Sequence, residues 1–191
     1  MPFSDSVFNL EVASLIKNNN FHNYLDIGAG KGKYGRMVRG IKKDVKITAI
    51  EPDESYIKRF KLKSLYDKVI NKTAEEFIEG NPDYLTEMVI IGDCLEHLKK
   101  SDGLDLIHFF VYRSKMIVVI FPSKYIQLSW QGHKLEAHRS VWSKEDFEQF
   151  DNQYLKKGHT NMVIIRGYLA DPEALAEISV KKQLGKQLGL K

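Results

Sequence analysis

A glycine-rich turn preceded by an acidic residue is the part of this sequence best suited to bind a ligand. It reads YLDIGAGKGKYG, in which Gly28, Gly30 and Gly32 follow Asp26 at two-residue intervals. Glycines in the turn after a strand let a ligand approach the backbone closely. The dinucleotide-binding pattern needs its third glycine three positions after the second, where this sequence has Lys33. The spacing therefore disfavours a pyrophosphate ligand.

Two carboxylates at this edge bear on the charge of the ligand. Asp26 would repel a pyrophosphate, but it can accept a hydrogen bond from an ammonium group, directly or through water. Glu51 follows the next apolar run, in AIEPD, and Pro52 ends that run so that the Glu51 carboxylate projects into the cleft. An acid at this point suits the two hydroxyl groups of a ribose. We therefore expect a ligand that is cationic near the turn and carries a ribose near Glu51.

The acid, the glycine turn and the second acid, in this order and spacing, resemble the class I methyltransferases that use S-adenosylmethionine (SAM). The resemblance is closest over residues 24–121. It implies that Asp26 and the three glycines lie against the methionine part of SAM. It also implies that Glu51, with Pro52 beside it, holds the ribose, and that the protein is an enzyme that transfers a methyl group.

The segment NKTAEEF corresponds to the loop that borders the adenine in this family. Thr73 stands where those enzymes often have an acid before Ala74, so the Thr73 hydroxyl or the Glu75 carboxylate would have to bind the adenine amino group. Thr73 and Glu76 also match a capping box at the start of a helix. The sequence leaves both roles open.

The segment GDCLEHL, residues 92–98, resembles a loop that lies beside the transferred methyl group in many small-molecule methyltransferases. The resemblance implies cofactor contacts for Asp93, Cys94 and Leu95. It places His97 next to the reaction centre, with Asp93 as an orienting carboxylate. We expect Cys94 to pack as a small apolar residue, because methyl transfer needs no thiol nucleophile.

The polar and aromatic segment 123–147 is long for a plain connection and is predicted to face the substrate. Its candidates for substrate contact are Trp130, Arg139 and Trp142. Its histidines, His133 and His138, join His97 as candidate catalytic bases.

Three further features of this segment bear on its role. No carboxylate or cysteine pattern completes a site around its histidines, so no metal is expected. A His-x-Ser-x-Trp run over residues 138–142 resembles one that leads into a capped helix in related enzymes. Ser143 and Asp146 would form that cap, and Trp142 has an alternative role as the anchor of the helix.

Methyl transfer from a sulfonium is a direct displacement, so the protein must hold donor and acceptor in line and exclude water. The expected acceptor is a small molecule or a sugar-like group, methylated at oxygen, whose proton a base removes. The alternatives are an RNA or protein methyltransferase, favoured by the net charge of +4 and a basic tail, and a non-catalytic nucleotide-binding module or a nicotinamide-dependent reductase.

These residues need elements that bring them together, and the sequence predicts them. Short apolar runs alternate with longer amphipathic ones, as in a Rossmann-like α/β fold with a doubly wound, mostly parallel sheet. The predicted helices cover residues 7–17, 34–41, 54–65, 74–79, 104–111 and 143–150. The predicted strands cover residues 23–27, 46–50, 68–71, 87–92, 115–121, 153–156 and 161–169. The short KKGHT connection makes the last two an antiparallel hairpin at the edge of the sheet.

The length of 191 residues predicts a single domain, which we place at residues 1–170 and follow with a basic helical tail at 171–191. The mild positive charge permits a nucleic-acid partner but does not argue for one, so a small-molecule partner is expected. The single cysteine, Cys94, excludes an intramolecular disulfide and predicts a reducing, cytoplasmic setting. No apolar run approaches the roughly 20 residues of a membrane helix. The sequence does not indicate an oligomeric state.

Overall fold

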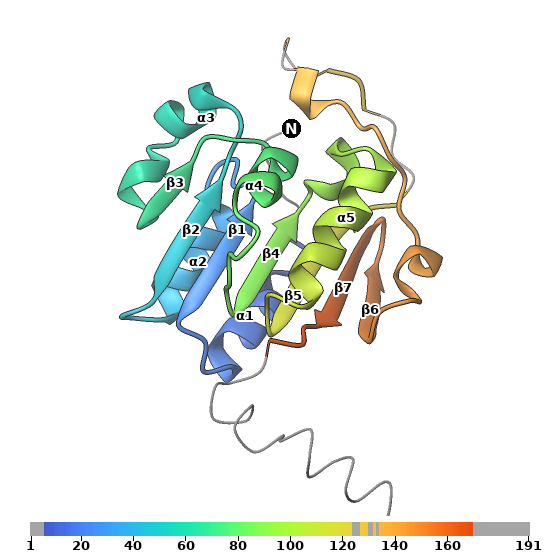
Figure 1. Ribbon diagram of the computed structural model, residues 1–191, viewed down its shortest axis with the longest axis horizontal. Coiled ribbons are helices and arrows are strands. Elements are labelled where there is room, and N and C mark those ends of the chain that lie inside the picture. The colour runs from blue at the N-terminus through green and yellow to red at the C-terminus, as the bar shows by residue number, and fades with distance from the viewer. Residues whose placement is uncertain (1–5, 124–126, 130–131, 133, 170–191) are drawn as a thin grey trace, which may run out of the picture.

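The centre of the molecule is a mixed β-sheet. The computed structural model describes residues 6–123, 127–129, 132 and 134–169, and within these residues seven strands pair in the order β3-β2-β1-β4-β5-β7-β6 (Figure 1). The parallel strands are β1 (Asn23–Ile27), β2 (Lys46–Ile50), β3 (Lys68–Ile70), β4 (Met88–Gly92) and β5 (Met116–Pro122). The antiparallel strands are β7 (Thr160–Arg166), which pairs with β5, and β6 (Asn152–Lys157), which pairs with β7 at the edge.

Helices cover both faces of the sheet (Figure 1). On one face lie α1 (Asn9–Asn18) and α2 (Lys33–Ile41), with α3 (Glu54–Arg59) contributing to the same apolar cluster. On the other face lie α4 (Ala74–Gly80) and α5 (Lys100–Val111). Because β1, β2 and β4 run parallel, their carboxyl ends lie along one edge of the sheet.

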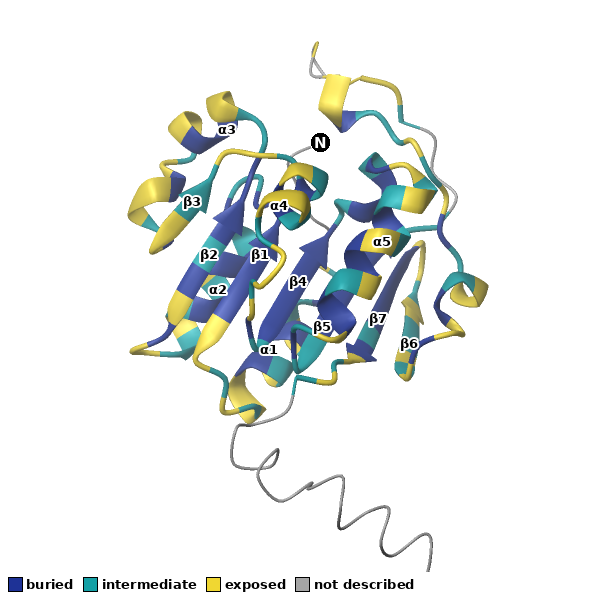
Figure 2. Ribbon diagram, in the orientation of Figure 1, coloured by how far each residue is buried: buried dark blue, intermediate teal, exposed yellow. Residues whose placement is uncertain are grey.

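The alternation of side chains along each strand divides the core into two clusters. Leu25 and Ile27 of β1 pack with α4 and α5, whereas Tyr24 packs with α1 and α2. The central strand β4 is buried over its whole length, as its run of four apolar residues predicts for a strand covered on both faces (Figure 2). The predicted fold class is therefore confirmed, including the antiparallel hairpin at the edge.

Two predicted helices have different bounds in the structure. The helix expected over residues 54–65 ends at Arg59, because Lys61 adopts a left-handed backbone conformation with a φ of 53°. The chain continues as the 3-10 helix η1 (Leu62–Ser64), which buries Leu62. The helix expected from residue 104 begins one turn earlier, at Lys100.

The prediction of a helix over residues 143–150 is wrong. The structure has only a 3-10 helix there, η4 (Lys144–Phe147). The N–H groups of Glu148 and Phe150 donate to carbonyls three residues earlier, at Glu145 and Phe147, and not four residues earlier as in an α-helix. The Asn152 side chain also donates to the carbonyl groups of Phe147 and Phe150, at 2.8 and 2.9 Å. The predicted cap of Ser143 and Asp146 is present.

Within the described ranges, no helix combines the length and the apolar composition needed to cross a bilayer. The predicted tail at residues 171–191, and with it the boundary after residue 170, lies outside the described residues.

Candidate cofactor-binding cleft

A cleft of about 400 Å³ opens at the carboxyl ends of β1, β2 and β4. Its volume lies in the range of roughly 300–1,000 Å³ that is typical of cofactor and small-molecule sites. The lining comes from the glycine turn, from the segments that follow β2, β3 and β4, and from residues 135, 136 and 139. The predicted ligand-binding edge is therefore a cavity.

Glu51 occupies the tip of β2 and lines the cleft, although it is only 4% exposed. Its Oε2 accepts a hydrogen bond from the backbone N–H of Gly30 at 2.7 Å, and its Oε1 accepts one from the N–H of Asp53 at 2.9 Å. Burial raises the pKa of Glu51 to about 7, although both N–H groups favour the charged form. The carboxylate thus ties the glycine turn to β2 and keeps lone pairs for a ligand.

Asp26 lies beneath the glycine turn and does not line the cleft. It is 2% exposed, and its Oδ2 accepts a hydrogen bond of 2.5 Å from the hydroxyl of Tyr66. The same hydroxyl accepts a hydrogen bond from the backbone N–H of Gly35 at 3.2 Å. Burial raises the pKa of Asp26 to about 6, against the lowering effect of Tyr66. Asp26 is therefore linked through Tyr66 to the start of α2. Of the two predicted modes of ligand contact, direct and through water, the direct one is not available from this position.

Gly28, Gly30 and Gly32 all have a positive φ, as the tight turn requires. At Gly28, where φ is 72°, an added Cβ would lie 2.5 Å from the Sγ of Cys94. Burial raises the pKa of the Cys94 thiol well above its usual range, so the sulfur packs as an apolar group. Both the backbone angle and the contact with Cys94 therefore require glycine at position 28.

Replacing Gly28 with alanine should lower the free energy of unfolding by about 3 kcal/mol, because a strained φ and a clash with Cys94 add together. Gly158→Ala is the matched control: Gly158 also has a positive φ, of 57°, but an added Cβ would meet nothing within 4 Å. The control should lose only about 1 kcal/mol. Urea denaturation of both variants checks this, and equal losses would show that the contact with Cys94 is unimportant.

Thr73, Ala74 and Glu75 line the cleft beyond the tip of β3. Thr73 and Glu76 form the capping box at the start of α4: the Thr73 hydroxyl accepts from the N–H of Glu76, and the Glu76 carboxylate accepts from the N–H of Thr73. The Oε2 of Glu75 is buried, and no hydrogen bond reaches it from the described residues. Glu75 is therefore the acceptor best placed to receive a hydrogen bond from a ligand here.

The loop after β4 contributes Asp93, Cys94 and His97 to the lining. Its 3-10 helix η2 (Leu95–His97) directs His97 toward the cleft, where the Nδ1 of His97 lies 3.2 Å from the carbonyl oxygen of Ala137. Burial lowers the pKa of His97. The neighbouring Glu96 is 4% exposed, and burial together with the charge of Asp93 raises its pKa well above the usual range.

The described residues 134–142, which we call the strap, close one side of the cleft and are fastened to η2. The backbone N–H groups of Arg139 and Ser140 donate to the carbonyl of Glu96 at 2.7 and 3.1 Å. Leu135, Glu136 and Arg139 line the cleft. The strap thus brings His138 beside His97, with 4.9 Å between the ring centroids.

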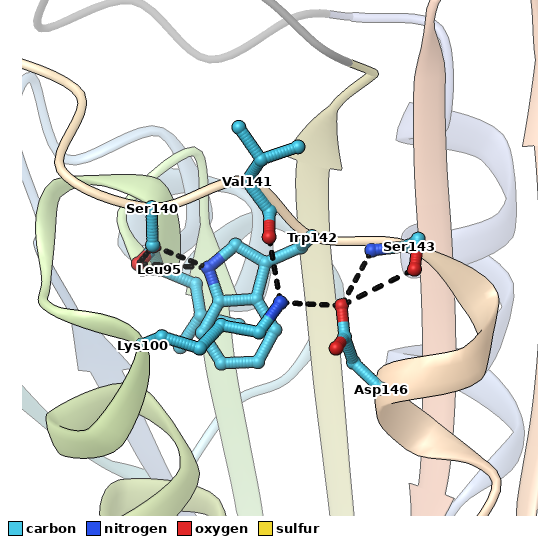
Figure 3. Close-up of polar contacts among 7 residues, drawn as sticks. All are labelled: Leu95, Lys100, Ser140, Val141, Trp142, Ser143 and Asp146. Carbon is cyan, nitrogen blue, oxygen red and sulfur yellow. Dashed lines mark hydrogen bonds and ion pairs between the residues drawn. The ribbon is translucent and has the colours of Figure 1, made fainter.

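Trp142 ends the strap and is 2% exposed, so the predicted substrate contact is not available to it. Its indole N–H donates to the carbonyl of Leu95 at 3.2 Å and to the Ser140 hydroxyl at 2.7 Å (Figure 3). The ammonium group of Lys100 lies 4.1 Å from the ring centroid and pairs with Asp146 at 2.5 Å (Figure 3). Trp142 therefore fastens the strap to α5 and η2.

Other predicted site residues have different positions as well. Gly32 and Leu95 do not line the cleft: Gly32 packs against Leu62 and Leu65, and Leu95 is fully buried in the core. Trp130 and His133 lie outside the described residues. The predicted residues that do line the cleft are Gly28, Gly30, Glu51, Pro52, Thr73, Ala74, Glu75, Asp93, Cys94, His97 and Arg139.

The cleft also contains residues that the sequence interpretation missed. Lys31, Lys33 and Arg36 line it at the start of α2 and supply positive charge beside the glycine turn. The alternation of lysine with glycine in GKGK could have indicated this positive charge from the sequence. Tyr56 lines the cleft from α3, and Glu136 lines it from the strap. Burial, followed by a hydrogen bond to Glu136, raises the pKa of Tyr56. No pattern in the sequence links these two residues.

No protein-family model matches this chain, and no curated protein matches it in sequence. Solved structures match its fold. An O-methyltransferase family protein from Burkholderia thailandensis superposes with a TM-score of 0.62 and 9% sequence identity. The superposition covers 86% of this chain and 57% of that one. The plantazolicin methyltransferase BpumL, solved with S-adenosylhomocysteine (SAH), gives a TM-score of 0.60 and 12% identity, covering 86% of each chain.

A third structure, the small RNA methyltransferase HEN1, superposes with a TM-score of 0.61 and 13% identity, covering 86% of this chain and 26% of that one. All three sequence identities are too low to indicate more than a shared fold. The strand order with its antiparallel edge agrees with this likeness. This chain therefore has the Rossmann-like fold of the SAM-dependent methyltransferases.

Proposed function

We propose that the protein is a methyltransferase that binds SAM in this cleft and transfers its methyl group to an oxygen of a small-molecule or sugar-like acceptor. SAM supplies an electrophilic methyl group on a sulfonium sulfur. The observation that carries the proposal is the Glu51 carboxylate, which is held at the tip of β2 by the N–H groups of Gly30 and Asp53. In this position the carboxylate can accept hydrogen bonds from both hydroxyl groups of a ribose.

The other lining residues fit the remaining parts of this ligand. The buried and unpartnered Oε2 of Glu75 suits the adenine amino group. Lys31, Lys33 and Arg36 provide positive charge for the methionine carboxylate, beside a turn whose glycines allow close approach. The Oδ1 of Asp26 is buried and has no hydrogen bond from the described residues, so it can act on the ammonium group through a water molecule.

The acceptor would enter between η2 and the strap. An acceptor hydroxyl has to lose its proton as its oxygen bonds to the methyl carbon, and His97 and His138 are the imidazoles that lie together there. Arg139 lines the same side and can hold a polar acceptor. The chain's own residues thus have to orient the acceptor, exclude water and take up the proton.

An RNA acceptor is a second candidate, because three basic residues line the cleft and because one structural neighbour is named a small RNA methyltransferase. A salt-sensitive gel shift with RNA would favour it. A small molecule remains our proposal, since the net charge of +4 is mild. We also infer a reducing, cytoplasmic setting from the single cysteine of the sequence, Cys94, which cannot form an intramolecular disulfide.

Isothermal titration with SAH tests the proposal and carries a pH prediction. Glu51 has a pKa of about 7 in the folded protein, so its charged form increases about tenfold between pH 6 and pH 8. Since ribose hydroxyl groups donate to the charged form, SAH affinity should rise by about the same factor over this range. In the Glu51→Gln variant, the increase in SAH affinity that comes from ionisation of Glu51 should be absent.

The comparison with Glu51→Gln removes the titration of the ligand's own amino group, which is common to both proteins. An equal pH dependence in the two proteins would contradict the role of Glu51. The absence of SAH binding, together with binding of NADH, would overturn the proposed function in favour of a reductase.

A further inference from the structure

Three potential metal ligands gather where the strap meets η2. They are the Glu96 carboxylate and the imidazoles of His97 and His138, and their ligand atoms all lie within 4.8 Å of one another. Along the sequence His138 has only His133 nearby as a potential ligand, which is why no metal was expected. Glu96 and His97 come from a loop some forty residues earlier, so the fold alone brings this set together.

Backbone hydrogen bonds hold the cluster in place. The carbonyl of Glu96 accepts from the N–H groups of Arg139 and Ser140, and these two residues directly follow His138. The rings of His97 and His138 meet edge to face, at 75° between their planes. The three groups are therefore arranged by the backbone of two docked segments rather than by chance contact of mobile side chains.

The hydrogen bond of His97 fixes its tautomer. A carbonyl oxygen can only accept, so the Nδ1 of His97 donates to the carbonyl of Ala137, 3.2 Å away, and the lone pair lies on Nε2. A backbone carbonyl on one ring nitrogen is the usual partner of a histidine that binds a metal through the other. His97 also lines the cleft, so this lone pair belongs to the wall that an acceptor would reach.

Glu96 provides an independent sign that this cluster binds a ligand. It is 4% exposed, and its Oε2 is buried without a hydrogen bond from the described residues. Leaving a carboxylate oxygen buried and unsatisfied is costly. Two more acids, Asp93 and Glu136, lie close enough to add negative charge around it. A cation would satisfy the oxygen and balance this charge.

We propose that Glu96, His97 and His138 bind a divalent transition-metal ion such as zinc or iron(II). Two imidazoles and one carboxylate are a ligand set that these ions use, whereas magnesium and calcium prefer oxygen ligands alone. Bonds of about 2.1 Å to one ion keep ligand atoms within roughly 4.2 Å of each other. At tetrahedral angles such bonds place the ligand atoms roughly 3.4 Å apart, so binding would draw the groups in the cluster together by up to about 1.4 Å.

The role of the ion rests on the proposed function. Three protein ligands leave coordination positions for an acceptor oxygen, and the ion would lower the pKa of that hydroxyl group. The hydroxyl proton would leave to solvent, an oxygen lone pair would form the bond to the methyl carbon, and the electrons of the broken carbon–sulfur bond would stay on sulfur, leaving neutral SAH. His97 and His138 would then hold the ion instead of removing the proton themselves.

Titration of the full chain with Co²⁺ tests the site directly. The protein is prepared without an affinity tag and freed of metal with a chelator, and visible absorption then follows Co²⁺ binding and its displacement by Zn²⁺. We expect one ion per chain. Glu96→Gln, His97→Gln and His138→Gln should each weaken binding by about 100-fold, a loss at least as large as that for an outer-shell partner. His159→Gln, at an exposed histidine outside the cluster, is the control and should bind as the unaltered chain does.

Three results would overturn the metal site: no Co²⁺ binding at millimolar concentration, binding that survives in all three variants, or a thiolate charge-transfer band that places the ion on Cys94. Thermal melts followed by circular dichroism show that each variant is folded. SAH titration without metal separates the two proposals. SAH binding without Co²⁺ binding removes the metal site only, and Co²⁺ binding without SAH binding removes the proposed function and the role of the ion in it.

Discussion

Replacement of Glu51 by glutamine should weaken SAH binding by about 100-fold. Hydrogen bonds to a charged group each contribute about 1.5–3 kcal/mol, and the ribose would lose the charged partner of both its hydroxyl groups. Glutamine keeps the size of the side chain, but its amide nitrogen cannot accept from the N–H of Gly30 or Asp53. Isothermal titration at pH 8, where Glu51 is mostly charged, measures the loss.

Glu54→Gln is the matched control for this experiment. Glu54 lies three residues away, is exposed and pairs with Lys58 on the surface of α3. Its replacement should change SAH affinity by less than about twofold, because exposed ion pairs contribute little. If Glu51→Gln bound SAH as tightly as Glu54→Gln does, the ligand would not be held at the tip of β2.

Replacement of Trp142 by alanine should lower the free energy of unfolding by about 3–5 kcal/mol, as is usual for a buried aromatic side chain. The variant would lose the packing of the indole against Gly103, where an added Cβ would lie 2.5 Å from the ring. It would also lose the hydrogen bonds to Leu95 and Ser140 and the contact with Lys100. A loss of this size is a large part of the 5–15 kcal/mol that stabilises a typical domain.

Urea denaturation measures this effect, with Tyr112→Ala as the control. Tyr112 is 69% exposed and stacks only on Tyr168 among the aromatic residues that the structure describes, so its loss should change stability by about 1 kcal/mol or less. Since Trp142 fastens the strap, Trp142→Ala should also weaken any Co²⁺ binding at Glu96, His97 and His138. A loss of stability no larger than that of Tyr112→Ala would contradict the anchoring role.

The fold could be predicted because its signals are local. The apolar run of β4 and the alternation of strands and helices are visible in the sequence, and the short connection near Gly158 predicts the hairpin. The errors occurred where one residue overrides the periodic pattern. Lys61 breaks a helix by its backbone angle, and the Asn152 side chain binds the Phe147 and Phe150 carbonyls where the 3-10 helix η4 ends.

The site could be predicted only in part, because its partners come from distant segments. The glycine turn and Glu51 follow from their places after two strands. In contrast, Asp26 is bonded to Tyr66, 40 positions away, and Trp142 is bonded to Leu95, 47 positions away. Such pairs leave no periodic trace in one sequence. Burial therefore keeps Asp26 and Trp142 from direct contact with a ligand, and both support the walls of the cleft.

A crystal structure of the protein grown with SAH tests the central claim most directly. We predict that the ligand lies in the cleft with both ribose hydroxyl groups within hydrogen-bond distance of the Glu51 carboxylate and with its sulfur facing η2 and the strap. A ligand bound elsewhere, or a cleft that excludes SAH but admits a dinucleotide with its diphosphate on the glycine turn, would contradict the account.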